Sequence, residues 1–430
     1  MPCVRPEKRG GAEGERARLR AAQAAYSGAV HAARRADWRK FLTEKGIGEP
    51  FGQPYRVAVG RRTTFQLATL RDSQAKSWDG AAEESLAALF PGDSLQGETP
   101  EQVELCQAMG RANTEVAVVP HPEDSALECI VRTFRPGKAP GPDRIEVRML
   151  QKACPLVSSW YGVIIRKVLE LGYFPKEWKK GRVFVLRKPG NIDPADPKAY
   201  RPLCLLGYPS KLLERVMVAE LESQLRMGVN AQHSFRKGRS TTSAILELQW
   251  AVQEAPDKYV LGIFVDIRGA FDNVWWPAVM GDLGMRGCNP FVHNLLLSYF
   301  EDREVIYEEG NRKAKRLITK GCPQGSVLEP QLWNVLSDTV ITALEAWDVE
   351  MVAYADDLVI IVKGASRLII ERKAIEVVAE LVDRCSGLKM EIALNKTVMM
   401  LLKGRLIGGT LSSGSKEKDW LMLRASSIWV

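Results

Sequence analysis

The sequence predicts an α+β protein of two or three subdomains, and three observations carry this prediction. The chain has 430 residues, of which 46% are hydrophobic and 8% aromatic, which is enough for more than one core. Long segments carry apolar side chains at helical spacing, whereas short runs rich in Val, Ile and Leu indicate strands. The clearest run, MVAYADDLVIIV at 351–362, predicts two antiparallel strands joined by a tight turn.

The N-terminal part predicts a basic helix followed by a connector. Residues 12–42 are rich in Ala and Arg, and their apolar residues at helical spacing are Leu19, Tyr26, Val30, Ala33 and Phe41. Residues 43–100 predict a connector with a helix near 80–90. Residues 1–50 hold 11 Lys/Arg and 6 Asp/Glu, so the net charge of +8 is concentrated there. The charge favours nucleic acid as a partner, with an anionic membrane surface or a solvated, packed helix as alternatives.

Helices dominate from about residue 124. Residues 123–134 predict a helix, 135–145 a Pro/Gly loop, and the segment up to Pro175 a longer helix. A short strand is expected in GRVFVLRKPG at 181–190, and the segment from 199 is interpreted as a turn leading into a helix.

A polar loop opens the next expected helix. Residues 232–253 pass from this loop into a helix for which Ser240 or Thr241 is the expected N-cap. Basic residues cluster in this loop and around the preceding strand, and they are Arg187, Lys188, Arg201, Arg236, Lys237 and Arg239.

Three carboxylates stand at the ends of expected strands. The apolar run 259–265 ends at Asp266, and Asp356 and Asp357 occupy the turn of the later hairpin. Taken singly, Asp266 is explained equally well as a helix cap, and the Asp pair is better explained as an ordinary hairpin turn. If the strands pair, the three carboxylates converge and repel one another unless cations neutralise them. Carboxylate oxygens suit Mg²⁺, and two such ions serve in-line displacement at phosphorus.

A glycine-containing loop lies between these acidic elements. KGCPQGSVLEPQLWNVLSD at 320–338 predicts a loop that enters a helix. On its own such a loop is usually only a turn. Together with the acids it could line the floor under a nucleotide, because glycine permits close approach and Gln324 offers a donor and an acceptor.

Cysteine spacing and hydropathy exclude several classes of protein. The eight cysteines contain no Cys-x-x-Cys pair, which argues against a zinc knuckle or a disulfide framework and favours a reducing, intracellular compartment. No apolar stretch approaches the roughly 20 residues needed to cross a bilayer, so no membrane partner is expected. The first ten residues lack the apolar segment of a secretory signal.

The ordered motifs resemble the reverse transcriptases of non-LTR retrotransposons, and most closely those of R1-type elements of insects. The resemblance covers roughly 130–402 and rests on KAPGPD, GRVFVLRKPG, AYRPLCLL, SFRKGRSTTSAI, FVDIRGAFDNV, KGCPQGSVL, YADD and GLKMEIALNKT. AARRADWRKFL also resembles the linker that such polyproteins carry between endonuclease and polymerase.

This resemblance implies a right-hand polymerase that extends a DNA primer on an RNA template with dNTP substrates. Residues 1–115 would form a basic helical linker and connector, 120–257 the fingers, and 258–403 a palm with an antiparallel sheet and inserted helices. Asp266, Asp356 and Asp357 would hold two Mg²⁺ ions, with Mn²⁺ as a substitute.

The resemblance also implies roles for residues around the acids. Lys188 and Arg201 would bind the triphosphate, and Phe271 would exclude a ribose 2′-OH. Gln324 and Gly325 would contact the template and the nucleotide, and Tyr354 would lie beside the primer end. Lys396 would be the acid that protonates the departing pyrophosphate.

Three features depart from the family pattern. Ser234 and Glu329 stand where glycine is usual, and 404–430 does not resemble a thumb. Glu329 is expected to add negative charge near the triphosphate, which favours the alternative of a degenerate remnant that at most binds nucleic acid. Another palm enzyme, such as an RNA-copying RNA polymerase or a maturase, is the third possibility. Phe271 and the linker argue against it.

Overall fold

A computed structural model divides the chain into two units, residues 1–65 and 66–430. The residues described in it are positions between 21 and 40 with gaps, 78–111, 113, 119, 121–188, 196–224 and 231–404. In the first unit the described residues between 21 and 40 are helical, as the sequence predicts, while Leu19, Phe41 and the tail from 405 lie outside the described residues.

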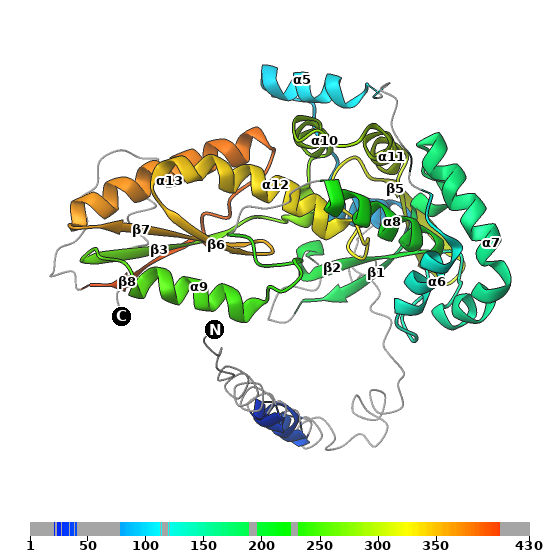
Figure 1. Cartoon of the computed structure of the whole chain (residues 1–430), viewed down its shortest axis with the longest axis horizontal. Coiled ribbons are helices and arrows are strands. Elements are labelled where there is room, and N and C mark those ends of the chain that lie inside the picture. The colour runs from blue at the N-terminus through cyan, green and yellow to red at the C-terminus, as the bar shows by residue number, and fades with distance from the viewer. Residues whose placement is uncertain are drawn as a thin grey trace, which may run out of the picture. The chain divides into compact units, whose positions relative to one another are not determined.

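Helices account for much of the second unit (Figure 1). Their bounds are α4 Trp78–Leu89, α5 Pro100–Met109, α6 Asp124–Thr133, α7 Val147–Leu171, α8 Tyr208–Gln224, α9 Thr241–Gln253, α10 Trp276–Met285, α11 Pro290–Phe300, α12 Glu329–Leu344 and α13 Arg367–Gly387. The expected helices near 80–90, over 123–134 and before Pro175 are confirmed. Helix α7 ends because Gly172 adopts φ +57°, a left-handed conformation that suits glycine.

One four-stranded sheet has the order β2-β1-β4-β5. Its strands are β1 Lys180–Arg187, β2 Tyr200–Leu206, β4 Glu304–Glu309 and β5 Arg312–Leu317. Strand β1 runs antiparallel to β2 and parallel to β4, and β4 and β5 form an antiparallel hairpin. Two strands from after residue 300 therefore complete a sheet begun before residue 210.

The interpretation of the segment from 199 as a turn is wrong, because it contains strand β2. Alternate residues Tyr200, Pro202 and Cys204 are buried, which is the two-residue period of a strand with one covered face. Pro202 suggests a turn in the sequence, yet β2 is an edge strand in the described sheet, where proline is tolerated.

The second sheet has the order β6-β7-β3-β8 and is antiparallel throughout. Its strands are β3 Tyr259–Asp266, β6 Glu350–Tyr354, β7 Asp357–Gly364 and β8 Val398–Lys403. The predicted hairpin at 351–362 is confirmed as β6 and β7. Five of the eight residues of β3 are buried, as expected for a central strand with helices on both faces.

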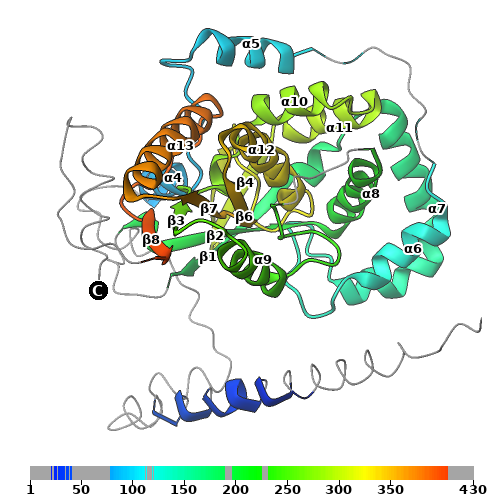
Figure 2. The same cartoon turned by 60° about the vertical axis from the view of Figure 1, so that its left-hand side comes forward.

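Helices cover both faces of this second sheet. Helices α12 and α13 pack on one face and α9 on the other, as the two views agree (Figure 2). Apolar residues of α9, such as Ala244 and Leu248, meet Val260 and Val352 of the sheet in a small separate core. Ser240 is the N-cap of α9, one of the two residues expected there, with its hydroxyl accepting a hydrogen bond from the Ser243 N–H.

The KAPGPD loop packs closely on the junction between β2 and α8. A Cβ atom at Gly141 would lie 2.4 Å from the backbone nitrogen of Gly207, so no larger residue fits without movement. The Arg182 guanidinium donates a hydrogen bond to the Pro140 carbonyl and ties the loop to β1. This loop therefore contacts the start of α8 and two strands of the first sheet, β1 and β2.

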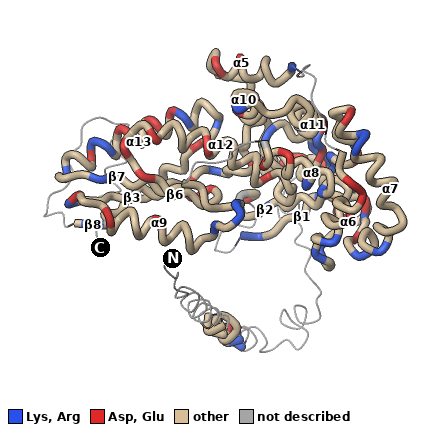
Figure 3. Tube along the Cα trace, viewed as in Figure 1, with Lys and Arg blue, Asp and Glu red and all other residues tan. Residues whose placement is uncertain are grey.

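Surface charge in the second unit is mixed. Lys and Arg alternate with Asp and Glu along α13, where pairs such as Arg367–Glu371 and Arg384–Glu380 lie four residues apart (Figure 3). The cysteines that the structure describes are all free. Within the described part of the chain, no helix combines the length and apolar character needed to cross a membrane.

Candidate active site

Two strands of the second sheet bring the acidic residues to one edge. Asp266, the last residue of β3, pairs directly with Asp357, the first residue of β7. Asp356 precedes Asp357 in the turn, and Tyr354 ends β6 opposite Asp357. Strand pairing therefore brings Asp266 beside the Asp356–Asp357 pair, although 90 residues of chain separate them.

The acids influence one another electrostatically. Partial burial raises the pKa of the Asp357 carboxyl, and the neighbouring charges of Asp356 and Asp266 raise this pKa further. The Lys396 ammonium lies 3.5 Å from the Asp266 Oδ2 atom and partly offsets this repulsion. The backbone fixes this lysine, because the Ala393 N–H donates to the Asp266 carbonyl and the Lys396 N–H donates to the Ala393 carbonyl.

Hard oxygen donors of this kind suit a divalent cation. Among the residues that the structure describes, no three His, Cys, Asp or Glu side chains already stand at metal-binding spacing. A cation would therefore need to draw the carboxylates together or share them with phosphate oxygens and water. Burial is the larger cause of the raised pKa of Asp357, and the rest comes from the charges of Asp356 and Asp266, a repulsion that a cation would relieve.

Basic residues of the first sheet face this region. Lys188 follows β1, and its N–H donates a 2.7 Å hydrogen bond to the Ala199 carbonyl just before β2. Burial lowers the pKa of the Lys188 amine, and the adjacent positive charge of Arg201 acts in the same direction, whereas Asp272 opposes it. The Lys396 charge also lowers this pKa, so Lys188, just after β1, and Lys396, two residues before β8, interact electrostatically.

A short 3-10 helix, Phe271–Asn273, holds Phe271 and Asp272 against the glycine-containing loop. Cys322 donates its N–H to the Phe271 carbonyl at 2.9 Å, and the Gln324 amide donates to the Asp272 carboxylate at 3.1 Å. Burial raises the pKa of Asp272. The Phe271 ring lies between two other rings, edge-on to Phe235 with centroids 6.3 Å apart and tilted against Trp333 at 5.4 Å.

The loop that carries Gln324 and Gly325 packs on β2. The Cys204 N–H donates to the Gln324 carbonyl at 2.8 Å. Gly325 has φ +118°, and a Cβ there would lie 2.6 Å from the Cys204 carbonyl oxygen. Only glycine fits this conformation and this contact.

The surroundings of Glu329 argue against the expectation that this residue adds negative charge to the nucleotide site near neutral pH. Burial raises the pKa of Glu329 to about 8, an effect opposed by a hydrogen bond from the Gly325 N–H and reinforced by Asp272 and Glu214. The carboxyl is therefore mostly protonated at pH 7. Its Oε2 atom accepts the Gly325 N–H at 2.9 Å, so the first residue of α12 supports the loop.

Sequence reasoning did not identify several residues at this site. Asp272 faces Lys188 and Gln324, and an acid six residues after Asp266 was a signal that could have found it. The contacts of Ser234 and Trp333 with the turn at Ala355 had no such signal, because more than 20 residues separate each of them from the turn.

Comparison with known proteins identifies relatives along most of the chain. Residues 186–423 match the family "Reverse transcriptase (RNA-dependent DNA polymerase)". Over 390 residues the chain is 31% identical to a putative 115 kDa protein in the type-1 retrotransposable element R1DM of Drosophila melanogaster, covering 90% of this chain and 36% of that protein.

Two further relatives come from insect mobile elements. The chain is 29% identical over 382 residues to the Pol polyprotein from the type-1 retrotransposable element R1 of Bradysia coprophila, covering 86% of this chain and 36% of that protein. It is 31% identical over 242 residues to the RNA-directed DNA polymerase from the mobile element jockey of Drosophila melanogaster, covering 54% of this chain and 26% of that protein. The chain thus spans about a third of the length of its first relatives.

Proposed function

The chain belongs to the reverse transcriptase family, as a domain homologous to the RNA-directed DNA polymerases of non-LTR retrotransposons, and from this premise we propose that it extends a DNA primer on an RNA template by nucleotidyl transfer. The pairing of Asp266 with Asp357 beside Asp356 is the observation that carries the proposal. It supports a reaction at phosphorus because the site combines hard oxygen donors with facing lysines.

The proposal assigns the two sheets to two parts of a right-hand polymerase. Sheet β6-β7-β3-β8, covered by α9, α12 and α13, would be the palm, and sheet β2-β1-β4-β5 with α6, α7 and α8 would belong to the fingers. The range 258–403 then contains the four strands of the palm sheet and also the β4-β5 hairpin, which belongs to the other sheet. Residues 1–115 would be the linker and connector.

Asp266, Asp356 and Asp357 would hold two Mg²⁺ ions, or Mn²⁺ in their place. When bound, these ions would stabilise charge on the attacking and leaving oxygens of an in-line displacement. Around them the proposal gives Lys188 and Arg201 the task of binding the triphosphate. Because its ammonium lies beside Asp266, Lys396 would deliver the proton to departing pyrophosphate.

The remaining residues would position the substrates. The Phe271 ring, held between Phe235 and Trp333, would occupy the space of a ribose 2′-OH and favour dNTPs. Gln324 and Gly325 would contact the template and nucleotide from a loop fixed on β2. Tyr354 would contact the primer end.

Primer extension tests this function directly. Purified protein is supplied with poly(rA)/oligo(dT), dTTP and Mg²⁺, and we expect extended primer from the wild type and none from Asp356→Asn, which keeps the shape of the side chain but loses its charge. Asp383→Asn, an exposed change on α13, is the matched control and should retain activity. Extension by Asp356→Asn at the wild-type rate would refute the assignment, and an inactive wild type would favour a degenerate remnant.

A further inference from the structure

The turn that carries the Asp pair depends on an unusual backbone conformation. Ala355 has φ +58°, in a two-residue turn between Tyr354 and Asp357. Glycine is the usual residue at a positive φ in such turns, because a Cβ atom crowds the backbone there. Alanine keeps this conformation only where neighbouring groups hold it. The directions of Asp356 and Asp357, which follow immediately, therefore depend on those neighbours.

Buried side chains hold Ala355 from two sides. Its N–H donates a 2.7 Å hydrogen bond to the Ser234 Oγ atom, and its carbonyl accepts a 2.7 Å hydrogen bond from Trp333 Nε1. The Gln232 side-chain amide donates a longer bond, 3.4 Å, to the same carbonyl. Ser234 is only 2% exposed and Trp333 only 1%, so water has little access to replace a lost partner.

The Ser234 hydroxyl is itself oriented. Its hydrogen is directed to the Gln232 Oε1 atom at 3.0 Å, which leaves an oxygen lone pair for the Ala355 N–H. The backbone N–H of Ser234 donates to the same Oε1 atom at 3.1 Å. The serine therefore has one low-energy arrangement, and that arrangement accepts from the turn.

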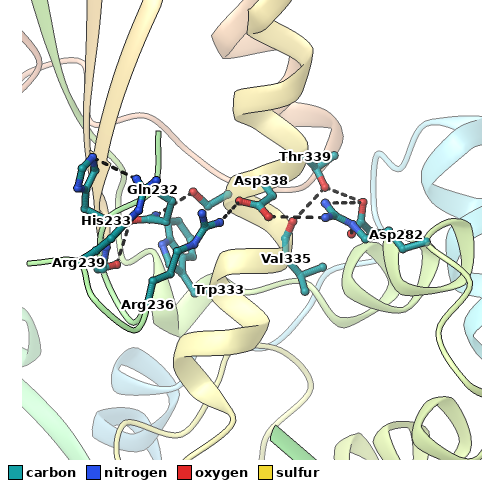
Figure 4. Close-up of polar contacts among 12 residues, drawn as sticks. Gln232, His233, Arg236, Arg239, Asp282, Trp333, Val335, Asp338 and Thr339 are labelled. Carbon is teal, nitrogen blue, oxygen red and sulfur yellow. Dashed lines mark hydrogen bonds and ion pairs between the residues drawn. The ribbon is translucent and has the colours of Figure 1, made fainter. Parts of the chain in front are cut away.

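The loop that carries Ser234 is anchored at both sides of this serine. His233 donates its N–H to the Ala353 carbonyl, and Ala353 donates its N–H to the Ala231 carbonyl, both at 2.8 Å. After the serine, the Arg236 guanidinium bonds at 3.2 Å to the fully buried Asp338 carboxylate of α12 (Figure 4). These contacts hold the loop beside the β6-β7 turn.

We propose that Ser234 is a positioning residue that holds the Ala355 turn and thereby aims Asp356 and Asp357 at the metal ions. This inference rests on the proposed function, because the carboxylates need a precise direction only if they bind metal. Loss of the hydroxyl removes the acceptor of the Ala355 N–H and frees the strained peptide. The carboxylates then lose their alignment before a cation arrives, and the affinity for the cation falls.

Ser234→Ala tests the proposal through two measurements that need no catalysis. Hydrogen exchange followed by mass spectrometry reports on residues 351–358, and electron paramagnetic resonance of free Mn²⁺ reports the affinity for the metal alone. We expect exchange at Ala355 to be about tenfold faster and Mn²⁺ affinity about tenfold weaker. Ser223→Ala, an exposed change on α8, is the matched control and should change neither.

Trp333→Phe gives a second route to the same peptide, because it removes the donor to the Ala355 carbonyl and keeps an aromatic ring beside Phe271. It should also speed exchange and weaken Mn²⁺ binding, and it decides the matter if Ser234→Ala does not fold. Unchanged exchange, or faster exchange with unchanged Mn²⁺ affinity, would overturn the proposal. If Ser234→Ala weakens Mn²⁺ binding but the wild type extends no primer, the proposal about Ser234 stands and the proposed function is refuted instead.

Discussion

The half-buried carboxyl of Glu329 leads to a specific prediction about the pH dependence of folding stability. Burial raises the pKa of this group from 4.5 to about 8 in the folded chain. The folded state therefore binds this proton more tightly than the unfolded state does. The resulting stabilisation is complete below pH 4.5 and is lost progressively as the pH rises to about 8.

The size of the effect follows from the pKa difference. Each pKa unit corresponds to about 1.4 kcal/mol, so the full shift sets an upper bound of roughly 4 to 5 kcal/mol. Glu329 remains partly accessible to water, which screens the charge, and we expect about 2 kcal/mol between pH 5 and pH 8. In a unit of this size that free energy shifts the melting temperature by about 2 to 3 °C.

Glu329→Gln isolates this contribution. The glutamine oxygen can still accept the hydrogen bond from the Gly325 N–H, but the side chain no longer titrates. Melting temperatures of the variant and the wild type are measured by circular dichroism at pH 5 and pH 8. We expect the melting temperature of the variant, relative to that of the wild type, to rise by about 2 to 3 °C between pH 5 and pH 8.

An exposed control, Glu177→Gln, reports the effect of removing a surface carboxylate that pairs with Lys180. The reasoning is refuted if the difference in melting temperature between Glu329→Gln and the wild type is the same at both pH values.

Glu329→Gln also tests the expectation from the sequence that a charge at Glu329 weakens nucleotide binding. Because the carboxyl of the wild type is mostly protonated at pH 7, the KM of Glu329→Gln for dTTP at this pH should match the wild-type KM.

Three further predictions concern other parts of the chain. Phe271→Ala should relax discrimination against rNTPs in primer extension, and unchanged discrimination would argue against a steric role for the ring. Gly141→Ala should destabilise the protein by at least 2 kcal/mol in urea unfolding, since its Cβ would overlap Gly207, whereas an unchanged midpoint would show that the loop can shift. Asp338→Asn should cost about 3 kcal/mol in the same assay because it leaves Arg236 partly buried beside a neutral amide, and a neutral effect would contradict the ion pair.

The sequence by itself determined several of the local elements and the positions of the acids. Apolar runs ending in Asp266 and preceding Asp357 predicted strands with carboxylates at their ends, because alternation and turn chemistry depend only on neighbouring residues. The cap at Ser240 was recognisable for the same reason. The ordered motifs of the sequence were also sufficient to indicate the family that the comparisons showed.

Only the tertiary structure decided how distant segments meet. Strand β2 was not recognised because Pro202 resembles a turn signal until the neighbouring strand is known. The ionisation of Glu329 depends on burial by residues that are far from it in the sequence. The support of Ala355 by Ser234 joins positions 121 residues apart. Propensity and periodicity describe neighbours along the chain, whereas pKa values and the conformation of a strained turn depend on neighbours in space.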